Sequence, residues 1–233
     1  MVVNTVQDTI YILRTKLNAL SDDSSLSNRL LYRCLKSARS LLMKRALDQK
    51  KLYKSMEFQP LNCYEFELVD LSTCCEVKTG YKVLKSKDRI PDLIDTTLSL
   101  AVRGIYSIEL GTRFDLTTLN NLQAQLSGRF TVVKPQAFIF GNYLYVYGIT
   151  DIPETAFTID GLWENPEIVW ELNQCKGKRC NCDEETINCI SYLDAEFPYP
   201  HYMEDAIIEE SIKGLETYFK IPKDKQNDGR ASI

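Results

Sequence analysis

The sequence predicts an α+β protein, a helical bundle that carries a β-rich insertion lobe. Residues 22–54 and 201–221 each have an apolar stripe with helical spacing, and residues 130–148 alternate in the manner of a β-hairpin. The two helical stretches lie far apart in the sequence, and neither can bury its stripe locally. We therefore expect an amino-terminal helical hairpin to pack with a carboxyl-terminal helix, and the β-hairpin to belong to a separate lobe.

This fold class predicts a division of the chain into three parts. Residues 1–57 and 198–222 form the helical core, residues 58–197 form the β-rich insertion with a Cys-rich loop at 175–189, and residues 223–233 form an extended tail. The 233 residues, 44% of them hydrophobic and 26% charged, are enough for one large domain or two modest ones.

Composition also predicts a compartment. No run approaches the roughly 20 apolar residues that span a bilayer, and the first residues lack the regions of a signal peptide. We expect a protein without a membrane partner that is made in the cytoplasm, where its eight cysteines stay reduced.

The first helix is predicted from a capping-box-like pair, Thr5 and Asp8. Apolar residues follow at alternating spacings of four and three, and they are Val6, Ile10, Leu13, Leu17 and Leu20. So narrow an apolar seam requires a partner helix. A polar turn near Ser21 leads into the next helix, which predicts a helical hairpin.

The second helix is predicted over residues 22–54, because neither Gly nor Pro interrupts residues 26–56 and a helix of about 45 Å can form. The candidate N-caps are Asp22, Asp23, Ser24 and Ser25. At 100° per residue, one broad apolar stripe contains Leu30, Leu31, Cys34, Leu35, Ala38, Leu41, Leu42, Leu52 and Tyr53. The opposite face is basic and contains Arg29, Arg33, Lys36, Lys44, Lys50, Lys51 and Lys54.

The middle of the chain predicts β structure. We expect strands at residues 105–110 and 155–162 and a helix over 115–126 that is capped by Asp115. Between them, Gly141 and Asn142 form a two-residue type II′ hairpin signature inside the stretch FTVVKPQAFIFGNYLYVYG. Alternation then places Tyr143, Tyr145 and Tyr147 on one face of a strand and Leu144 and Val146 on the other.

The last predicted helix spans residues 201–221, with Pro200 suited to its first position and Pro222 ending it. Its apolar stripe contains Ile208, Ile212, Leu215 and Phe219. Its other side is acidic and contains Glu204, Asp205, Glu209, Glu210 and Glu216. The tail that follows is too polar to fold alone.

Charge is divided unequally along the chain. Residues 1–60 hold 11 Lys/Arg and 5 Asp/Glu, a balance of +6, whereas residues 150–233 hold 8 and 18, a balance of −10. The acidic third argues against nucleic-acid binding by the whole chain. The division instead allows one end of a molecule to attract the opposite end of a neighbouring copy.

Catalytic patterns are absent from the sequence. The only histidine is His201, and there is no nucleophile elbow, P-loop, dinucleotide fingerprint or zinc-protease motif. The adjacent acidic pairs Asp22/Asp23 and Glu209/Glu210 are typical of solvated helix surfaces. The sequence therefore predicts a protein that is not an enzyme.

The best candidate for a metal site is the set Cys175, Cys180, Cys182 and Cys189, which has the spacing C-x4-C-x-C-x6-C. Four thiolates could hold a structural zinc ion and cross-link a polar loop. The spacing is not a pair of C-x2-C knuckles, and Lys176, Lys178 and Arg179 are typical of a solvated loop. We expect free thiols and no metal or other cofactor, while structural zinc stays open as the alternative.

The basic face of the second helix has two interpretations. It could contact phosphate, but nucleic-acid sites interleave aromatic and basic residues, and the nearby Tyr53 lies on the apolar stripe. A solvated face, or a partner for acidic surfaces, fits better. The tyrosine stripe of Tyr143, Tyr145 and Tyr147 could likewise be a binding platform, although such stripes more often pack under a neighbouring element.

Two stretches together resemble a known family. SDDSSLSNRLLYRCLKSARSLLMKR near the start, and FPYPHYMEDAIIEESIKGLE running into IPKDKQNDGR near the end, are similar to neck proteins of podoviral bacteriophages, in particular the ring proteins of crAss-like phages. These stretches cover about a third of the chain and contain no catalytic signature. The Cys-rich loop has no counterpart in the family pattern.

The resemblance implies a head-to-tail connector in the neck of the virion, assembled in the cytoplasm of the bacterial host. It implies that twelve copies form a ring below the portal protein, next to other neck or tail proteins, and that genomic DNA passes through the channel. We expect the subunit interface or the channel to involve Arg29, Arg33, Lys36, Lys44, Glu204, Asp205, Glu209 and Glu210. The alternative function is a nucleic-acid-associated accessory protein with a structural zinc loop.

Overall fold

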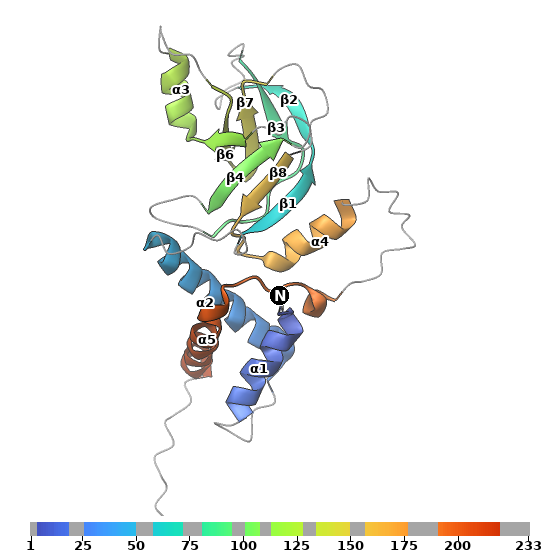
Figure 1. The fold of residues 1–233 in the computed structure, drawn as a ribbon, viewed down its shortest axis with the longest axis vertical. Coiled ribbons are helices and arrows are strands. Elements are labelled where there is room, and N and C mark those ends of the chain that lie inside the picture. Colours follow the sequence, from blue (N-terminus) through green and yellow to red (C-terminus); the bar gives the residue numbers. More distant parts are fainter. Residues whose placement is uncertain are drawn as a thin grey trace, which may run out of the picture.

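The computed structural model of the chain describes residues 4–18, 26–49, 58–71, 81–94, 101–107, 113–127, 134–149, 157–176 and 191–219. Figure 1 shows a curled sheet at one end of the molecule and three helices, α1, α2 and α5, at the other. The helix α4 lies between them. The described helices are α1 (Val6–Asn18), α2 (Asn28–Asp48), α3 (Leu119–Ser127), α4 (Pro166–Lys176) and α5 (Glu204–Phe219).

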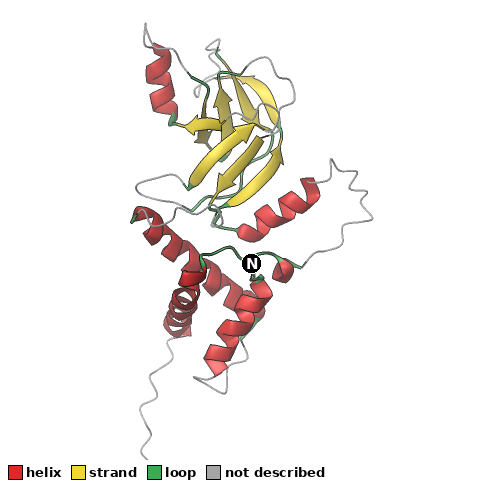
Figure 2. Ribbon diagram, in the orientation of Figure 1, coloured by secondary structure: helices red, strands yellow, loops and turns green. Residues whose placement is uncertain are grey.

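The strands form one eight-stranded sheet in the order β1-β8-β4-β5-β6-β7-β3-β2. They are β1 (Gln59–Tyr64), β2 (Phe66–Asp70), β3 (Lys82–Ser86), β4 (Val102–Ser107), β5 (Arg113–Leu116), β6 (Gln136–Phe140), β7 (Tyr143–Tyr147) and β8 (Phe157–Gly161). Neighbours are antiparallel except β5 and β6, which are parallel. Figure 2 shows how strongly the sheet curls.

The curl brings the two edges of the sheet to one corner. The edge strands β1 and β2 are consecutive in the chain, and only Glu65 separates them. Beside this corner the rings of Phe66 and Phe157 lie 4.4 Å apart between centroids, in an edge-to-face arrangement. The sheet therefore encloses a core of its own, which includes the buried side chains of Ile105, Phe114, Leu144, Val146 and Ile159.

The predicted alternation in β7 is confirmed. Leu144 and Val146 are fully buried inside the curl, while the tyrosines of β7 are half-buried on the other face. There Tyr145 stacks on Phe138 at 5.0 Å, and α3 covers this face through Leu122. The tyrosine stripe thus packs under a neighbouring helix over part of its length.

The turn between β6 and β7 differs from its predicted type. Both central residues have positive φ, 58° at Gly141 and 62° at Asn142. Positive φ at both positions defines a type I′ turn, and the expected type II′ is wrong. Asn142 is held by its side-chain amide, which donates to Asp92 Oδ1 at 2.9 Å.

The predicted fold class is wrong, because the protein is not a helical bundle with a β insertion. The dominant element is the eight-stranded curled sheet, and of the five described α-helices α1, α2 and α5 lie at the other end of the molecule. The physical reason is that the strands bury a core of their own inside the curl, so they do not depend on a bundle for burial. α2 packs against α1 and α5, and its buried Tyr32 and Arg39 also join it to α4 and to residues 163 and 197–198. The expected division at residues 57/58 and 197/198 stays a prediction.

Individual elements also depart from expectation. Within the described residues α2 begins at its N-cap Ser27 rather than at one of residues 22–25, and its predicted extension to residue 54 lies beyond them. Asp115 pairs with Gln136 in the parallel β5–β6 ladder and does not cap a helix, so α3 begins later. Helix α4 was not predicted. The capping box of Thr5 and Asp8 is confirmed, with both backbone amides bonded reciprocally at 3.1 Å.

Arg39 joins the helices to the sheet. Its side chain is fully buried and donates from Nη1 to the carbonyl oxygen of Trp163 at 2.8 Å and from Nε to that of Pro198 at 2.6 Å. Burial lowers the pKa of Arg39 to about 10. Trp163, also fully buried, donates its indole N–H to the carbonyl of Gln59 on β1 at 2.9 Å. One chain of hydrogen bonds thus runs from α2 to the edge of the sheet.

Asn173 of α4 closes the β1 edge. Its side-chain oxygen accepts from the amide of Asn62 at 2.9 Å, and its side-chain nitrogen donates to the carbonyl of Pro60 at 2.7 Å. An amide side chain therefore occupies the place of a neighbouring strand. Edge strands with unpaired backbone groups are templates for aggregation, and this contact covers one of them.

Candidate subunit interface

The basic face of α2 is only partly free. Ser27 begins the helix by accepting a hydrogen bond from the Leu30 amide at 3.3 Å. Arg29 and Arg33 then follow in the first turns, and both are exposed. No described residue pairs with the side chain of either arginine. Lys44, further along the helix, is half-buried.

Lys36 is held within the chain. Its ammonium lies 2.6 Å from Asn165 Oδ1 and 3.3 Å from Glu167 Oε1 at the start of α4. The other oxygen of that carboxylate accepts a hydrogen bond of 2.5 Å from the hydroxyl of Tyr32. This cluster fastens α2 to α4, so Lys36 contributes to the joint inside the subunit.

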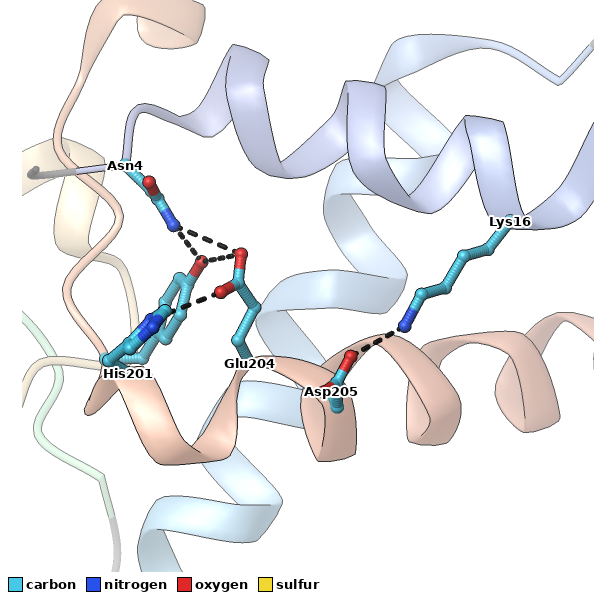
Figure 3. A network of polar contacts seen from close by, with 6 residues as sticks. Asn4, Lys16, His201, Glu204 and Asp205 are labelled. Carbon is cyan, nitrogen blue, oxygen red and sulfur yellow. Dashed lines mark hydrogen bonds and ion pairs between the residues drawn. The ribbon is translucent and has the colours of Figure 1, made fainter.

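Glu204, at the start of α5, is also satisfied internally (Figure 3). Its Oε1 accepts from the Asn4 amide and from the Tyr199 hydroxyl, both at 3.2 Å. Its Oε2 lies 3.3 Å from Nδ1 of the exposed His201. The network ties the start of α1 to the start of α5.

Asp205 is an exposed carboxylate with a partner on α1. Lys16 Nζ lies 2.7 Å from its Oδ1, and Figure 3 shows the two helices side by side with this pair between them. The hydrogen bond from Lys16 lowers the pKa of Asp205. Because both side chains are largely solvent-exposed, the pair contributes little to stability.

The remaining two acidic residues lie on different flanks of α5. Glu209 is exposed and pairs with no described residue. Glu210 lies 3.6 Å from Lys213 and borders a groove between α2 and α5. Thus, of the eight residues predicted for the interface, the structure places Arg29, Arg33 and Glu209 where another molecule can reach them without breaking a contact.

The groove between α2 and α5 was not predicted. It has a volume of about 600 Å³, and its lining includes Leu30, Arg33, Cys34, Leu41, Lys213 and Gly214. Leu30, Cys34 and Leu41 belong to the predicted apolar stripe of α2, but Leu41 is 38% exposed and the other two are half-buried. Burial raises the pKa of the Cys34 thiol, against the opposing effect of Arg33. The feature of the sequence that could have predicted this groove is the apolar stripe of α2, which is wider than one partner helix can cover.

Neither a metal centre nor a membrane helix is found in the described part of the chain. No group of three or more His, Cys, Asp or Glu side chains is placed there to hold a metal ion. Cys180, Cys182 and Cys189 lie outside the described residues, as does the side chain of Cys175. The expectation of free thiols, with structural zinc as the alternative, therefore stays a prediction. No described helix has the length and apolarity to cross a bilayer.

Comparison with known families assigns the chain. Residues 6–231 match the family model of phage tail ring protein 2, a ring protein of crAss-like phages. The chain belongs to this family of phage tail ring proteins. The resemblance inferred from two stretches of sequence is therefore confirmed. No curated protein matches the chain.

Membership of the tail ring protein family gives the geometry a context. A tail ring protein is a structural component of the virion that associates with copies of itself and with other tail components. Such a protein requires surfaces that stay unpaired in the single subunit. In this ring protein Arg29, Arg33 and Glu209 are exposed and have no described partner, and a groove lies between α2 and α5.

Proposed function

We propose that the chain is a structural subunit of a ring in the phage neck, between the portal protein and the tail. Twelve copies form the ring, genomic DNA passes through its channel, and other neck or tail proteins lie beside it. Assembly takes place in the host cytoplasm, and the subunit catalyses no reaction. The family match supports the ring, and the resemblance to neck proteins of podoviral phages supports the position in the neck.

One observation carries this proposal at the level of residues. Arg29 and Arg33 lie unpaired on α2, and Glu209 lies unpaired on α5, among the residues that the structure describes. A single chain thus presents free charges of both signs, positive on α2 and negative on α5. Contacts between unlike surfaces repeat from copy to copy and close into a ring when the rotation permits.

The other predicted interface residues take a supporting role in this proposal. Inside the subunit Lys36 pairs with Glu167 of α4, Glu204 accepts a hydrogen bond from Asn4, and Asp205 pairs with Lys16 of α1. These contacts hold in place the helices that present the free charges. Glu210 borders the groove between α2 and α5, and Lys44 is half-buried further along α2. Apolar burial supplies most of the affinity, while the charges set orientation and register.

The test is the double substitution Arg29→Glu/Arg33→Glu, which leaves Lys36 and its joint with α4 intact. We expect the variant to fold normally and to be missing from the ring, both in purified assemblies and in virus particles. Raised salt should weaken assembly of the wild-type chain, because the Debye length falls from about 10 Å at 0.1 M to about 3 Å at 1 M.

The matched control is Lys82→Glu/Lys134→Glu, which makes the same change in charge at two exposed residues, one in β3 and one just before β6. It should enter the ring as the wild type does. Counting subunits in mutant particles by electron microscopy decides the outcome. A full ring of the arginine variant, with altered DNA retention alone, would show that this face lines the channel and would overturn the interface.

A further inference from the structure

We propose that the groove between α2 and α5 receives helix α1 of the neighbouring copy, with Tyr11 as the anchoring side chain. The proposal rests on ring formation and identifies the contact that builds the ring. It follows from three features of the three-helix end of the molecule: an open groove, an exposed aromatic residue, and their positions on opposite sides of one layer.

The groove can take a helix. Its apolar lining comes from Leu30, Ala38 and Leu41 of α2. Lys213 and Glu210 also line the groove and lie 3.6 Å apart, so Arg33 is the lining charge that no described residue pairs with. On the α5 side stands Gly214, where an added Cβ would meet no atom within 4 Å. The space of about 600 Å³ beside this glycine is therefore open to a side chain from outside. A groove of this kind can receive one large apolar side chain from a helix that lies along its rim.

The neighbouring copy offers a matching helix face. Tyr11 of α1 is 72% exposed, the highest value among the large hydrophobic residues that the structure describes as exposed. Asp8 lies one turn before it and therefore on the same face of α1. Hydrogen bonds from Thr5 lower the pKa of Asp8, so its carboxylate carries a negative charge. An aromatic ring with an adjacent carboxylate complements a groove that has an apolar lining and the unpaired charge of Arg33 at its wall.

The positions of groove and anchor predict a head-to-tail contact. α1 and α5 form one layer against α2, joined by Lys16 and Asp205. At 100° per residue, Gly214 lies about 180° from Asp205 around α5, and Tyr11 lies about 140° from Lys16 around α1. Groove and anchor therefore face away from each other at the two ends of this layer. A neighbour that docks its α1 beside α5 extends the layer in one direction, as a ring requires.

The first test fills the groove without touching the anchor. Gly214→Leu places a side chain in open space and replaces glycine by a better helix former, so the subunit should fold at least as stably as wild type. We expect it to lose ring formation. Gly214→Ala, which leaves most of the groove empty, is the matched control and should assemble.

The second test removes the anchor. Tyr11→Ala should weaken the subunit contact by at least about tenfold, the loss typical of a buried aromatic anchor, without changing the fold. Phe140→Ala, which truncates another exposed aromatic residue at the far hairpin, should assemble normally. Native mass spectrometry of each purified full-length chain measures the oligomers.

Mixing the two variants tests direction. A Tyr11→Ala subunit keeps an open groove, and a Gly214→Leu subunit keeps its anchor, so together they should give heterodimers and no rings. A contact between identical surfaces would not produce this result. As an independent measurement, a chain that keeps Tyr11 and carries Thr15→Cys, one turn later on the same exposed face of α1, should form a disulfide ladder with Cys34 of the adjacent copy under mild oxidation. The added substitution Cys34→Ser should abolish the ladder.

The outcomes separate this inference from the proposed function. If wild type forms rings and both Gly214→Leu and Tyr11→Ala also form them, the ring stands and the groove contact is overturned. If wild type forms no ring in any assembly, the proposed function and this inference both fail. Loss of rings in both variants, with heterodimers on mixing, supports the contact.

Discussion

Tyr32 shows how one side chain joins α2 to α4 and to residues 192–197. Its ring lies 5.4 Å from that of Tyr192 and 6.0 Å from that of Phe197, and its hydroxyl donates to Glu167 of α4. Burial, followed by the adjacent carboxylate of Glu167, raises the pKa of Tyr32 above its ordinary value. The neutral hydroxyl is therefore the form that the folded protein favours.

This shift predicts a loss of stability in alkali. Above about pH 10 the unfolded chain releases the Tyr32 proton, whereas the folded chain keeps it. The folded state then binds more protons, and the free energy of unfolding falls by up to about 1.4 kcal/mol per pH unit for this group. Below about pH 10 the stabilisation is fully present. Urea titrations between about pH 8 and about pH 11 measure the slope.

Tyr32→Phe should reduce that slope, because the titrating hydroxyl is gone. Tyr11→Phe, at an exposed ring of α1, is the control and should keep the wild-type slope. An unchanged slope in Tyr32→Phe would show that Tyr32 does not account for the alkaline loss.

Single residues also show where sequence-based prediction reaches its limit. The reciprocal bonds of Thr5 and Asp8 were predictable because both partners lie within one turn. Arg39 was not, since its partners are carbonyl groups at residues 163 and 198. The free positions of Arg29 and Arg33 were predictable from the basic face. The internal pairing of Lys36 with Glu167 was not, because it joins elements 131 residues apart.

At the scale of elements, α4 has its clearest effect on the sheet edge. Replacing Asn173 by Leu removes a donor and an acceptor and leaves the Asn62 amide and the Pro60 carbonyl without this partner. We expect a loss of about 1–3 kcal/mol in the free energy of unfolding and faster aggregation, because the uncovered edge can pair with another chain. Chemical denaturation and light scattering measure the two effects.

Glu171→Leu, two residues earlier on an exposed position of α4, makes a comparable change in hydrophobicity and should leave both quantities near wild type. If both variants aggregate equally, added surface hydrophobicity and not the open edge is responsible.

Elements whose sequence pattern lies within consecutive residues were predicted correctly. Elements whose structure depends on contacts with residues far away in the sequence were not. The alternation of β7 and the hairpin at Gly141 appear in consecutive residues, so they could be found. Asp115 looks like a helix cap in isolation, yet β6 pairs with it from twenty-one residues away. The wide stripe of α2 likewise contains several candidate buried faces. Which of them is buried depends on α4 and α5, and sequence periodicity does not include that information.

For the whole molecule, the buried joint at Arg39 predicts cooperative unfolding. Its two hydrogen bonds connect α2 to residues on either side of α4, and Trp163 continues the connection to β1. We expect wild type to unfold in one transition, with far-UV circular dichroism and tryptophan fluorescence giving coincident midpoints.

Arg39→Ala should lower the free energy of unfolding by about 3 kcal/mol, because it leaves a cavity and two buried carbonyl groups without this partner. The two midpoints should then separate as the helical end and the sheet lose their connection. Arg33→Ala, on the exposed side of the same helix, is the control and should change stability by less than about 0.5 kcal/mol. Coincident midpoints in Arg39→Ala would show that other contacts carry the coupling.

The chain order of the packed elements has a consequence for synthesis. α2 packs against α5, and β1 pairs with β8. Elements made early in synthesis therefore cannot complete their packing until later elements have been translated. Pairings this distant in sequence form slowly. A nascent or prematurely terminated chain that lacks α5 also lacks one wall of the groove and the acidic flank with Glu209. If the proposed contact holds, such a fragment offers no complete groove to the next copy and cannot continue a ring, so a closed ring requires chains translated through α5.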